Sequence, residues 1–232
     1  MIHSCANTLD SYLIILKESN LFGNHMNFLI IMSQSSNFLR KHPGKGTFLS
    51  SISPIINATE LLTIYKTENI LLVDASNGPN TKLNYENKHL EGAIFADANT
   101  QLATIETDVA IGGRHPLPSI EDFSKTLGDL GITPQTWVVI YDDKNGANAA
   151  ARFWWMLRAI GHEKVQVLNG GIQAAEKIGF PVNSEPVSIA KTENYPCTTW
   201  QWPIASIDEV EKVAELPSHK VIDVREAFRY NG

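Results

Sequence analysis

The sequence lacks an excess of positive charge. Its 232 residues include 19 lysines and arginines against 25 aspartates and glutamates, so that the net charge at pH 7 is −6. A surface that binds the phosphate backbone of nucleic acids needs a basic excess. The charge balance therefore argues against nucleic acid as a partner and favours no other partner in particular.

Cysteine is scarce, since only Cys5 and Cys197 are present. They are far apart and form no CxxC or other spacing typical of a redox or zinc site. We interpret them as two unpaired thiols of a reducing compartment, with a disulfide between them as the alternative. His89, His115 and His162 are scattered without ligand spacing, and we expect them to be turn or surface histidines. The sequence therefore predicts no metal site and no cofactor.

Long apolar runs are lacking as well. A helix that spans a bilayer needs about 20 apolar residues, and the longest runs near the N-terminus are the short segments 12–16 and 28–32. We therefore expect no membrane. Residues 1–52 are predicted to be a leader outside the fold, either unstructured or preceding a true start at Met26 or Met32. The predicted compartment is the cytoplasm, or the mitochondrion if this leader is a transit peptide.

From residue 53 to residue 183, strand-like and helix-like segments alternate. Continuous apolar runs at 69–76, 137–143 and 164–171 predict strands that are buried on both faces, as in a parallel sheet. Helices are expected after Asn57 and after Ser119, each with a capping residue and nearby acids, and also over 148–161 and 172–179; glycines 131 and 161 are predicted helix stops. This alternation indicates an α/β fold with a central parallel sheet flanked by helices.

Residues 182–203 differ from the preceding chain because they have no hydrophobic period and contain three prolines. They are predicted to be an interdomain linker, which we set at 184–203. A helix and a strand follow in the same order as at the start of the domain. In both places a capping residue (Asn57, Ser206) precedes Glu by three residues and the Asp that ends the strand (Asp74, Asp223) by 17. The repeat predicts that residues 204–232 begin a second domain, although a capped helix before a strand is also common by chance.

Ligands of parallel α/β sheets bind beyond the carboxyl ends of the strands. One candidate is therefore "YDDKNGANAA", residues 141–150, where backbone N–H groups at the start of a helix would form a cradle for an anion or thiolate. Asp142 and Asp143 stand where a nucleophile would belong and would repel an anionic substrate. We expect this loop to be non-catalytic, with Asp143 and Asn148 as helix caps.

Further sequence features limit the reactions and binding sites that the chain could have. The chain contains no GxxxxGK[ST], GxSxG or HExxH motif. The aromatic run at 153–155 is expected to pack in a core or an interface. The turn at 169–171 is a further strand-end candidate. Arg225 follows the last strand and could bind an anion in bidentate fashion or form a surface ion pair.

Several segments together resemble a known family. These are "HLEGA" at 89–93, "RHPLP" at 114–118, the Arg-x-Trp-Trp run at 152–155 and the "LNGG" turn at 168–171. Over residues 57–182 the chain resembles the N-terminal domain of tandem rhodanese-type sulfurtransferases of the thiosulfate and 3-mercaptopyruvate type. "VIDVREAFRYNG" at the end of the chain is similar to the opening of the second domain of these proteins.

The resemblance implies ping-pong sulfur transfer from a small anionic donor to cyanide or a thiol, through a persulfide on a cysteine of the second domain. The first domain would be non-catalytic, with Asp142 at the position equivalent to that cysteine. Arg225 is the one substrate-binding residue that the resemblance assigns. The repeat of 149 residues places the nucleophile near position 291, and neither Cys5 nor Cys197 matches its place. The chain by itself is therefore expected to be inactive.

The sequence allows two alternatives to the sulfurtransferase interpretation. One is a short, non-catalytic rhodanese-like module that binds a partner or an anion and has a regulatory role. The other is a phosphatase of the related cysteine-loop type, for which both the cysteine and the longer catalytic loop are missing from the sequence. The sequence predicts neither the choice of sulfur donor nor the oligomeric state.

Overall fold

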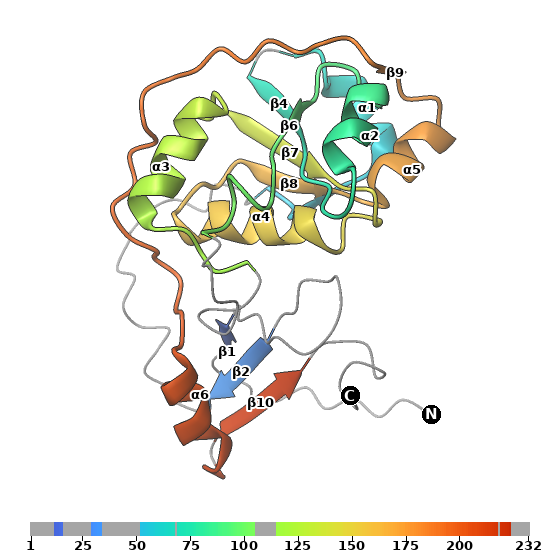
Figure 1. The fold of residues 1–232 in the computed structure, drawn as a ribbon. Helices are drawn as coiled ribbons and strands as arrows, with labels where there is room; N and C mark the ends of the chain where they lie inside the picture. The colour runs from blue at the N-terminus through green and yellow to red at the C-terminus, as the bar shows by residue number, and fades with distance from the viewer. Residues whose placement is uncertain are drawn as a thin grey trace, which may run out of the picture. The chain divides into compact units, whose positions relative to one another are not determined.

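The computed structural model describes residues 12–15, 29–33, 52–67, 69–104, 115–217 and 219–223. These residues form two compact units. The larger unit contains the described residues from 52 to 202, and the smaller unit contains those before 34 and after 202. Figure 1 labels most of the helices and strands of both units.

The larger unit is built on a sheet of five strands that all run parallel. Their order across the sheet is β3 (Ile55–Ile56), β8 (Val165–Leu168), β7 (Trp137–Tyr141), β4 (Ile70–Asp74) and β6 (Ile94–Phe95). The inner strands β7 and β8 are almost entirely buried. This arrangement confirms the central parallel sheet that the continuous apolar runs predict.

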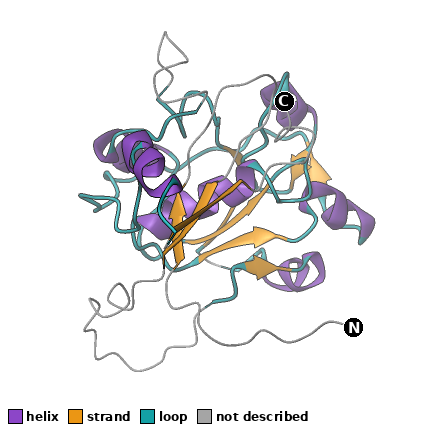
Figure 2. Ribbon diagram, turned by 90° about the horizontal axis from the view of Figure 1, so that it is seen from below, coloured by secondary structure: helices purple, strands orange, loops and turns teal. Residues whose placement is uncertain are grey.

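Helices cover both faces of this sheet, as Figures 1 and 2 show. Their bounds are α1 (Ala58–Ile64), α3 (Ile120–Asp129), α4 (Ala149–Ala159) and α5 (Gly171–Lys177). Helices α1 and α5 share a core with Val139 and Tyr141 of β7. The alternation of side chains along a strand points Val138 and Ile140 to the other face, where α4 contacts β7 and β8. Helix α3 meets α4 through an edge-to-face contact of Phe123 and Phe153.

The predicted helix ends are confirmed in most places. Ser119 caps α3 by accepting a hydrogen bond from Asp122 N at 3.0 Å. Gly131 and Gly161 follow α3 and α4 with φ of +72° and +87°, as C-terminal stops do. Asn57 stands at the N-cap of α1, but its side chain makes no capping bond. Its Oδ1 instead accepts from Asn169 Nδ2 at 3.0 Å, so the side chain links α1 to the turn after β8.

A smaller ladder lies beside the main sheet. Strand β5 (His89–Leu90) follows the short helix α2 (Thr81–Asn87) and pairs antiparallel with β9 (Val182–Asn183). This pairing places residues 182–183 next to β5, which follows β4 and α2 in the chain.

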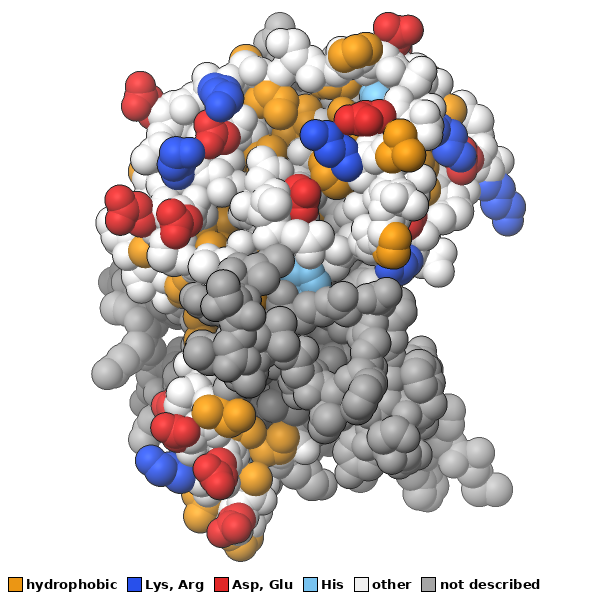
Figure 3. Space-filling model, viewed as in Figure 1, with side chains coloured by type: hydrophobic (Ala, Val, Ile, Leu, Met, Phe, Trp, Pro, Cys, Tyr) orange, Lys and Arg blue, Asp and Glu red, His pale blue; other side chains and the backbone are white. Residues whose placement is uncertain are grey.

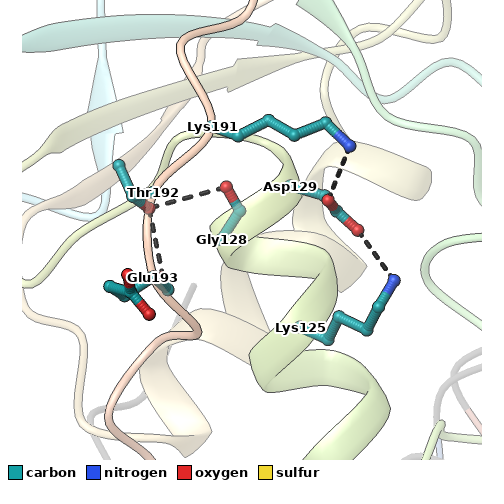
Figure 4. A network of polar contacts seen from close by, with 6 residues as sticks. All are labelled: Lys125, Gly128, Asp129, Lys191, Thr192 and Glu193. Atoms are coloured by element: carbon teal, nitrogen blue, oxygen red, sulfur yellow. Dashed lines mark hydrogen bonds and ion pairs between the residues drawn. The ribbon is translucent and has the colours of Figure 1, made fainter.

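Residues 184–202, which we call the strap, run in an irregular conformation along α3 and α4 (Figure 1). Backbone bonds connect Thr192 N to Gly128 O at 2.9 Å and Tyr195 N to Ser124 O at 3.0 Å. Figure 4 shows the same region, where Lys191 and Lys125 both bond to Asp129, at 2.8 and 3.1 Å. The segment predicted as a linker is thus irregular, as expected, and from Lys191 onward it is bonded to α3 and α4.

The end of the strap carries two tryptophans that join an aromatic cluster. Trp200 stacks on Phe123 and on Trp155, and Trp202 meets Trp154 and Trp155 edge to face. Phe123 and Trp155 are buried. The aromatic run at 153–155 is therefore packing surface, as the sequence predicts.

The smaller unit contains α6 (Ile207–Ala214) and an antiparallel sheet in the order β1 (Tyr12–Ile15), β2 (Leu29–Ser33), β10 (His219–Asp223). The predicted capping box of α6 is confirmed, with Glu209 N bonded to Ser206 Oγ at 3.2 Å and Ser206 N to Glu209 Oε2 at 2.7 Å. Two segments of the predicted leader are thus strands: β2 pairs with β10, the strand that ends at Asp223, and β1 pairs with β2. The start of a second domain at residue 204 stays a prediction.

Two surface properties bear on partners. In the part of the chain that the structure describes, no helix is long and apolar enough to cross a membrane. Acidic and basic side chains alternate over the visible face of the larger unit in Figure 3.

Candidate functional site

The loop of residues 142–148, which we call the Asp142 loop, connects β7 to α4. It therefore lies at the carboxyl end of a central strand, where ligands of parallel α/β sheets bind. Strands β4 and β8 flank β7, so the turns that follow these two strands are its neighbours. Lys144 ties the loop to one of them, since its Nζ donates to Asn77 O at 2.9 Å.

The carboxylate of Asp142 turns back into its own loop and accepts hydrogen bonds from four backbone N–H groups. Its Oδ1 accepts from Gly146 N at 2.7 Å and from Lys144 N at 2.8 Å. Its Oδ2 accepts from Ala150 N at 3.0 Å and from Asn148 N at 3.3 Å. Only 1% of Asp142 is exposed. The N–H cradle expected at the start of α4 is present, and a side chain of the chain itself occupies it.

The two residues predicted to cap α4 do not do so. Asn148 stands at the N-cap position without a capping side-chain bond, and Asp143 is exposed. Asp142 bonds the N–H groups at the start of the helix instead, because its side chain leaves the end of β7 toward the loop. A carboxylate does bond the start of α4, as predicted, but it belongs to Asp142 and not to Asp143.

The turn after β8 supports the loop from the neighbouring strand. Ile172 N donates to Asp142 O at 3.1 Å. Gly171 lies against the same carbonyl, with φ of +59°, and a Cβ at this position would be 2.3 Å from Asp142 O. Since no side chain fits there, the second glycine of the predicted turn at 169–171 is required by this close approach.

A second carboxylate lies at the end of the adjacent strand. Asp74 is the register partner of Tyr141, is 4% exposed and accepts from Ser76 N at 2.9 Å. The Tyr141 hydroxyl hydrogen-bonds to Asp74 and also accepts from Leu90 N at 3.2 Å. Burial raises the pKa of Asp74 above its ordinary value of 3.8, because the charged form loses solvation. The sequence marks Asp74 as the end of a strand but gives no signal for this buried network.

The histidines singled out in the sequence are all buried, so the surface alternative of the prediction was wrong. His115 and His162 lie in connecting segments, as turn histidines would, whereas His89 begins β5. His89, His115 and His162 are 1%, 6% and 1% exposed. Each ring bonds to a nearby group; the partners are Tyr85 O at 2.7 Å, Asn99 Oδ1 at 2.8 Å and the Tyr195 hydroxyl at 3.0 Å, respectively. Among the described residues, no group of three or more His, Cys, Asp and Glu side chains could hold a metal ion.

The remaining candidates are a thiol and a guanidinium. Cys197 is half-buried in the strap, and burial raises the pKa of its thiol above the ordinary value of 9.0. A nucleophilic cysteine needs the opposite shift. Cys5 and the predicted substrate-binding residue Arg225 lie outside the described residues.

The sequence pattern of the rhodanese-like domain matches residues 57–177, which is just over half of the chain. The chain belongs to the rhodanese-like domain family. The matched span runs from the N-cap of α1 to the end of α5 and includes the whole Asp142 loop.

Several relatives of this family member are sulfurtransferases. Thiosulfate sulfurtransferase of Cricetulus griseus is 34% identical over 149 residues, which are 64% of this chain and 48% of that protein. Thiosulfate/3-mercaptopyruvate sulfurtransferase 2 of Arabidopsis thaliana is 30% identical over 209 residues, 79% of this chain and 59% of that protein. Among solved structures, 3-mercaptopyruvate sulfurtransferase from Leishmania major matches with a TM-score of 0.53 and 29% identity, over 72% of this chain and 43% of that one. The chain thus spans about half the length of the relatives that it matches.

Proposed function

We propose that this rhodanese-like chain is part of a sulfurtransferase. The enzyme would move sulfane sulfur from thiosulfate or 3-mercaptopyruvate to a thiophilic acceptor such as cyanide or a thiol. Family membership and the names of the relatives support this assignment. The proposed compartment is the cytoplasm, or the mitochondrion if residues 1–52 are a transit peptide.

In the proposed reaction a cysteine thiolate attacks the outer sulfur of thiosulfate. A sulfur–sulfur bond forms to the cysteine, the bond between the two sulfurs of thiosulfate breaks, and sulfite leaves with the electron pair. The acceptor then attacks the terminal sulfur of the persulfide and restores the thiolate. No external oxidant or reductant is needed in either step.

We assign the larger unit the role of the non-catalytic domain, and the observation that carries this assignment is the carboxylate of Asp142 in the N–H cradle. A carboxylate cannot take up sulfane sulfur to form a persulfide. It also occupies the four N–H groups that would otherwise stabilise a thiolate or an anionic donor. The loop therefore has the backbone of a thiolate site without the nucleophile.

In the same proposal, the second domain begins at residue 204 and contributes Arg225 as a substrate-binding residue. Its guanidinium would bind the anionic donor in bidentate fashion, just beyond the strand that ends at Asp223. The larger unit would be the first domain, predicted over 53–183, with 184–203 between the two.

The first test of the proposal uses the 232-residue chain. Thiocyanate formation from cyanide should be undetectable with either donor, and a Cys5→Ser/Cys197→Ser double variant should give the same result. Robust turnover that survives both substitutions would contradict the non-catalytic role. The transcript past the codon for Gly232 should encode a strand, a cysteine-led loop near position 291 and a helix. A chain extended through that helix should make thiocyanate.

A second candidate is a non-catalytic rhodanese-like binding or regulatory module. The same filled cradle favours it, because the Asp142 loop has no nucleophile. An extended reading frame without a cysteine-led loop would favour this candidate over the sulfurtransferase.

A further inference from the structure

We infer that the identity of residue 142 determines whether the Asp142 loop can take up sulfur. The Asp142 carboxylate lies where the terminal sulfur of a sulfur-loaded cysteine would lie. A single change to cysteine would therefore let the loop take up sulfur. This inference rests on the proposed sulfurtransferase chemistry. It concerns the larger unit alone and needs no residue beyond it.

Aspartate and a sulfur-loaded cysteine carry their negative charge at the same number of bonds from Cβ. The carboxylate oxygens of Asp142 are two bonds beyond Cβ. In a cysteine persulfide, the terminal sulfur is also two bonds beyond Cβ. The four N–H groups of the loop lie 2.7–3.3 Å from these carboxylate oxygens. They are therefore directed at the position that the terminal sulfur would occupy.

The cradle does not depend on the Asp142 side chain alone. Gly146 has φ of +80°, and a Cβ there would lie 2.7 Å from Leu168 O, so the loop is held close to the end of β8 by its backbone. The bond from Ile172 N to Asp142 O and the close approach of Gly171 fix the start of the loop in the same way. A shorter side chain at position 142 would thus find the N–H groups already in place.

The cradle also lies close to solvent. Asp142 itself is buried, but residues 143, 145 and 147 of the same loop are exposed. Burial strengthens the hydrogen bonds to a charged group, since little water competes for the four N–H groups.

In Asp142→Cys, the N–H groups would lower the pKa of the new thiol and hold its thiolate. The thiolate would attack the outer sulfur of thiosulfate and form a sulfur–sulfur bond. The bond between the two sulfurs of thiosulfate would break, and sulfite would leave with the electron pair. The persulfide would then place its terminal sulfur among the N–H groups that now bind the carboxylate oxygens.

The test uses the full chain with Cys5→Ser and Cys197→Ser, so that position 142 carries the one thiol. Asp143→Cys in the same background is the matched control, because Asp143 is exposed and adjacent in sequence. With thiosulfate, D142C should release about one equivalent of sulfite per chain and gain the mass of one sulfur atom, whereas D143C should do neither. By ultraviolet titration, the thiol pKa of D142C should lie about one unit or more below that of D143C.

Equal thiol pKa values in the two variants, or no sulfur uptake by D142C, would overturn the inference. Comparison with Asp142→Ser gives a second measurement, which does not depend on sulfur uptake. The urea midpoint of D142C should rise relative to that of D142S as pH rises through the thiol pKa, because only the thiol gains a charge that the cradle can bind. Parallel pH profiles, or loss of the fold in D142C, would overturn it as well.

Failure of this inference is distinguishable from failure of the proposed function. If the extended chain makes no thiocyanate while D142C takes up sulfur, the proposed function fails and the inference about the loop stands. If the extended chain is active and D142C takes up no sulfur, the inference alone fails.

Discussion

The carbonyl oxygen of Asp142 and the α-carbon of Gly171 lie so close together that a Cβ on Gly171 would be 2.3 Å from that oxygen. The ends of β7 and β8 therefore meet backbone against backbone. At this junction four backbone N–H groups donate to one side chain, that of Asp142.

Replacement of Gly171 by alanine should destabilise the larger unit by about 2 to 4 kcal/mol, since the left-handed φ and the clash with a backbone atom both cost free energy. Urea unfolding of Gly171→Ala measures the loss. Gly179→Ala is the control, because Gly179 has φ of +76° and, apart from its chain neighbours, no residue comes within 4 Å of its Cβ position. It should lose only about 1 kcal/mol. Equal losses in the two variants would contradict the close approach.

Asp142→Asn should destabilise the larger unit by about 2 kcal/mol, because an amide nitrogen would face backbone N–H groups that now donate to a carboxylate oxygen. Asp143→Asn, one residue along and exposed, should leave the urea midpoint nearly unchanged. The prediction fails if both variants unfold at the same urea concentration as the wild type.

Gly128→Ala separates helix propensity from the fit of the strap. In an isolated helix the change would stabilise by about 1 kcal/mol. Here a Cβ would lie 2.7 Å from Glu193 O, so we expect a loss of about 1 to 3 kcal/mol and faster proteolysis within the strap. Lys125→Ala is the control, because it removes one exposed contact to Asp129 that Lys191 also makes (Figure 4). Lys125→Ala should change neither the unfolding free energy nor the rate of proteolysis appreciably. If Gly128→Ala instead stabilised the unit, the strap would not press on α3.

Acid should loosen the contact between His162 and the strap residue Tyr195. Burial, together with the charges of Arg158 and Lys164, lowers the pKa of His162 below its ordinary value of 6.5. The unfolded chain then binds this proton more readily, so the stability that His162 contributes is present above about pH 6.5 and is lost as pH falls toward the lower folded pKa. The difference in unfolding free energy between wild type and His162→Gln should shrink over that range, whereas a constant difference would refute the assignment.

The sheet could be predicted from the sequence because its strands are buried on both faces. The runs that became β4 and β7 are continuous in apolar residues, and such runs have few alternatives to a parallel sheet. Ser119 and Gly131 marked the ends of α3 for local reasons, since a cap and a left-handed stop depend on neighbours within a few residues.

Contacts within the folded chain explain why some sequence predictions were wrong. Asp142 and Asp143 are adjacent and chemically identical, and only the direction in which the chain leaves β7 decides which carboxylate enters the cradle. Asn57 does not cap α1 because its partner is Asn169, 112 residues away. The strap shows no hydrophobic period because its backbone bonds go to α3 and α4 and not to a strand.

The strap also bears on how the larger unit behaves when the chain is cut. Phe123 and Trp155 owe part of their burial to the rings of Trp200, which stack on both. A protein ending at residue 183 would present these aromatic rings to water as a continuous apolar surface, and such surfaces drive self-association. The smallest soluble form of this unit should therefore extend through residue 202.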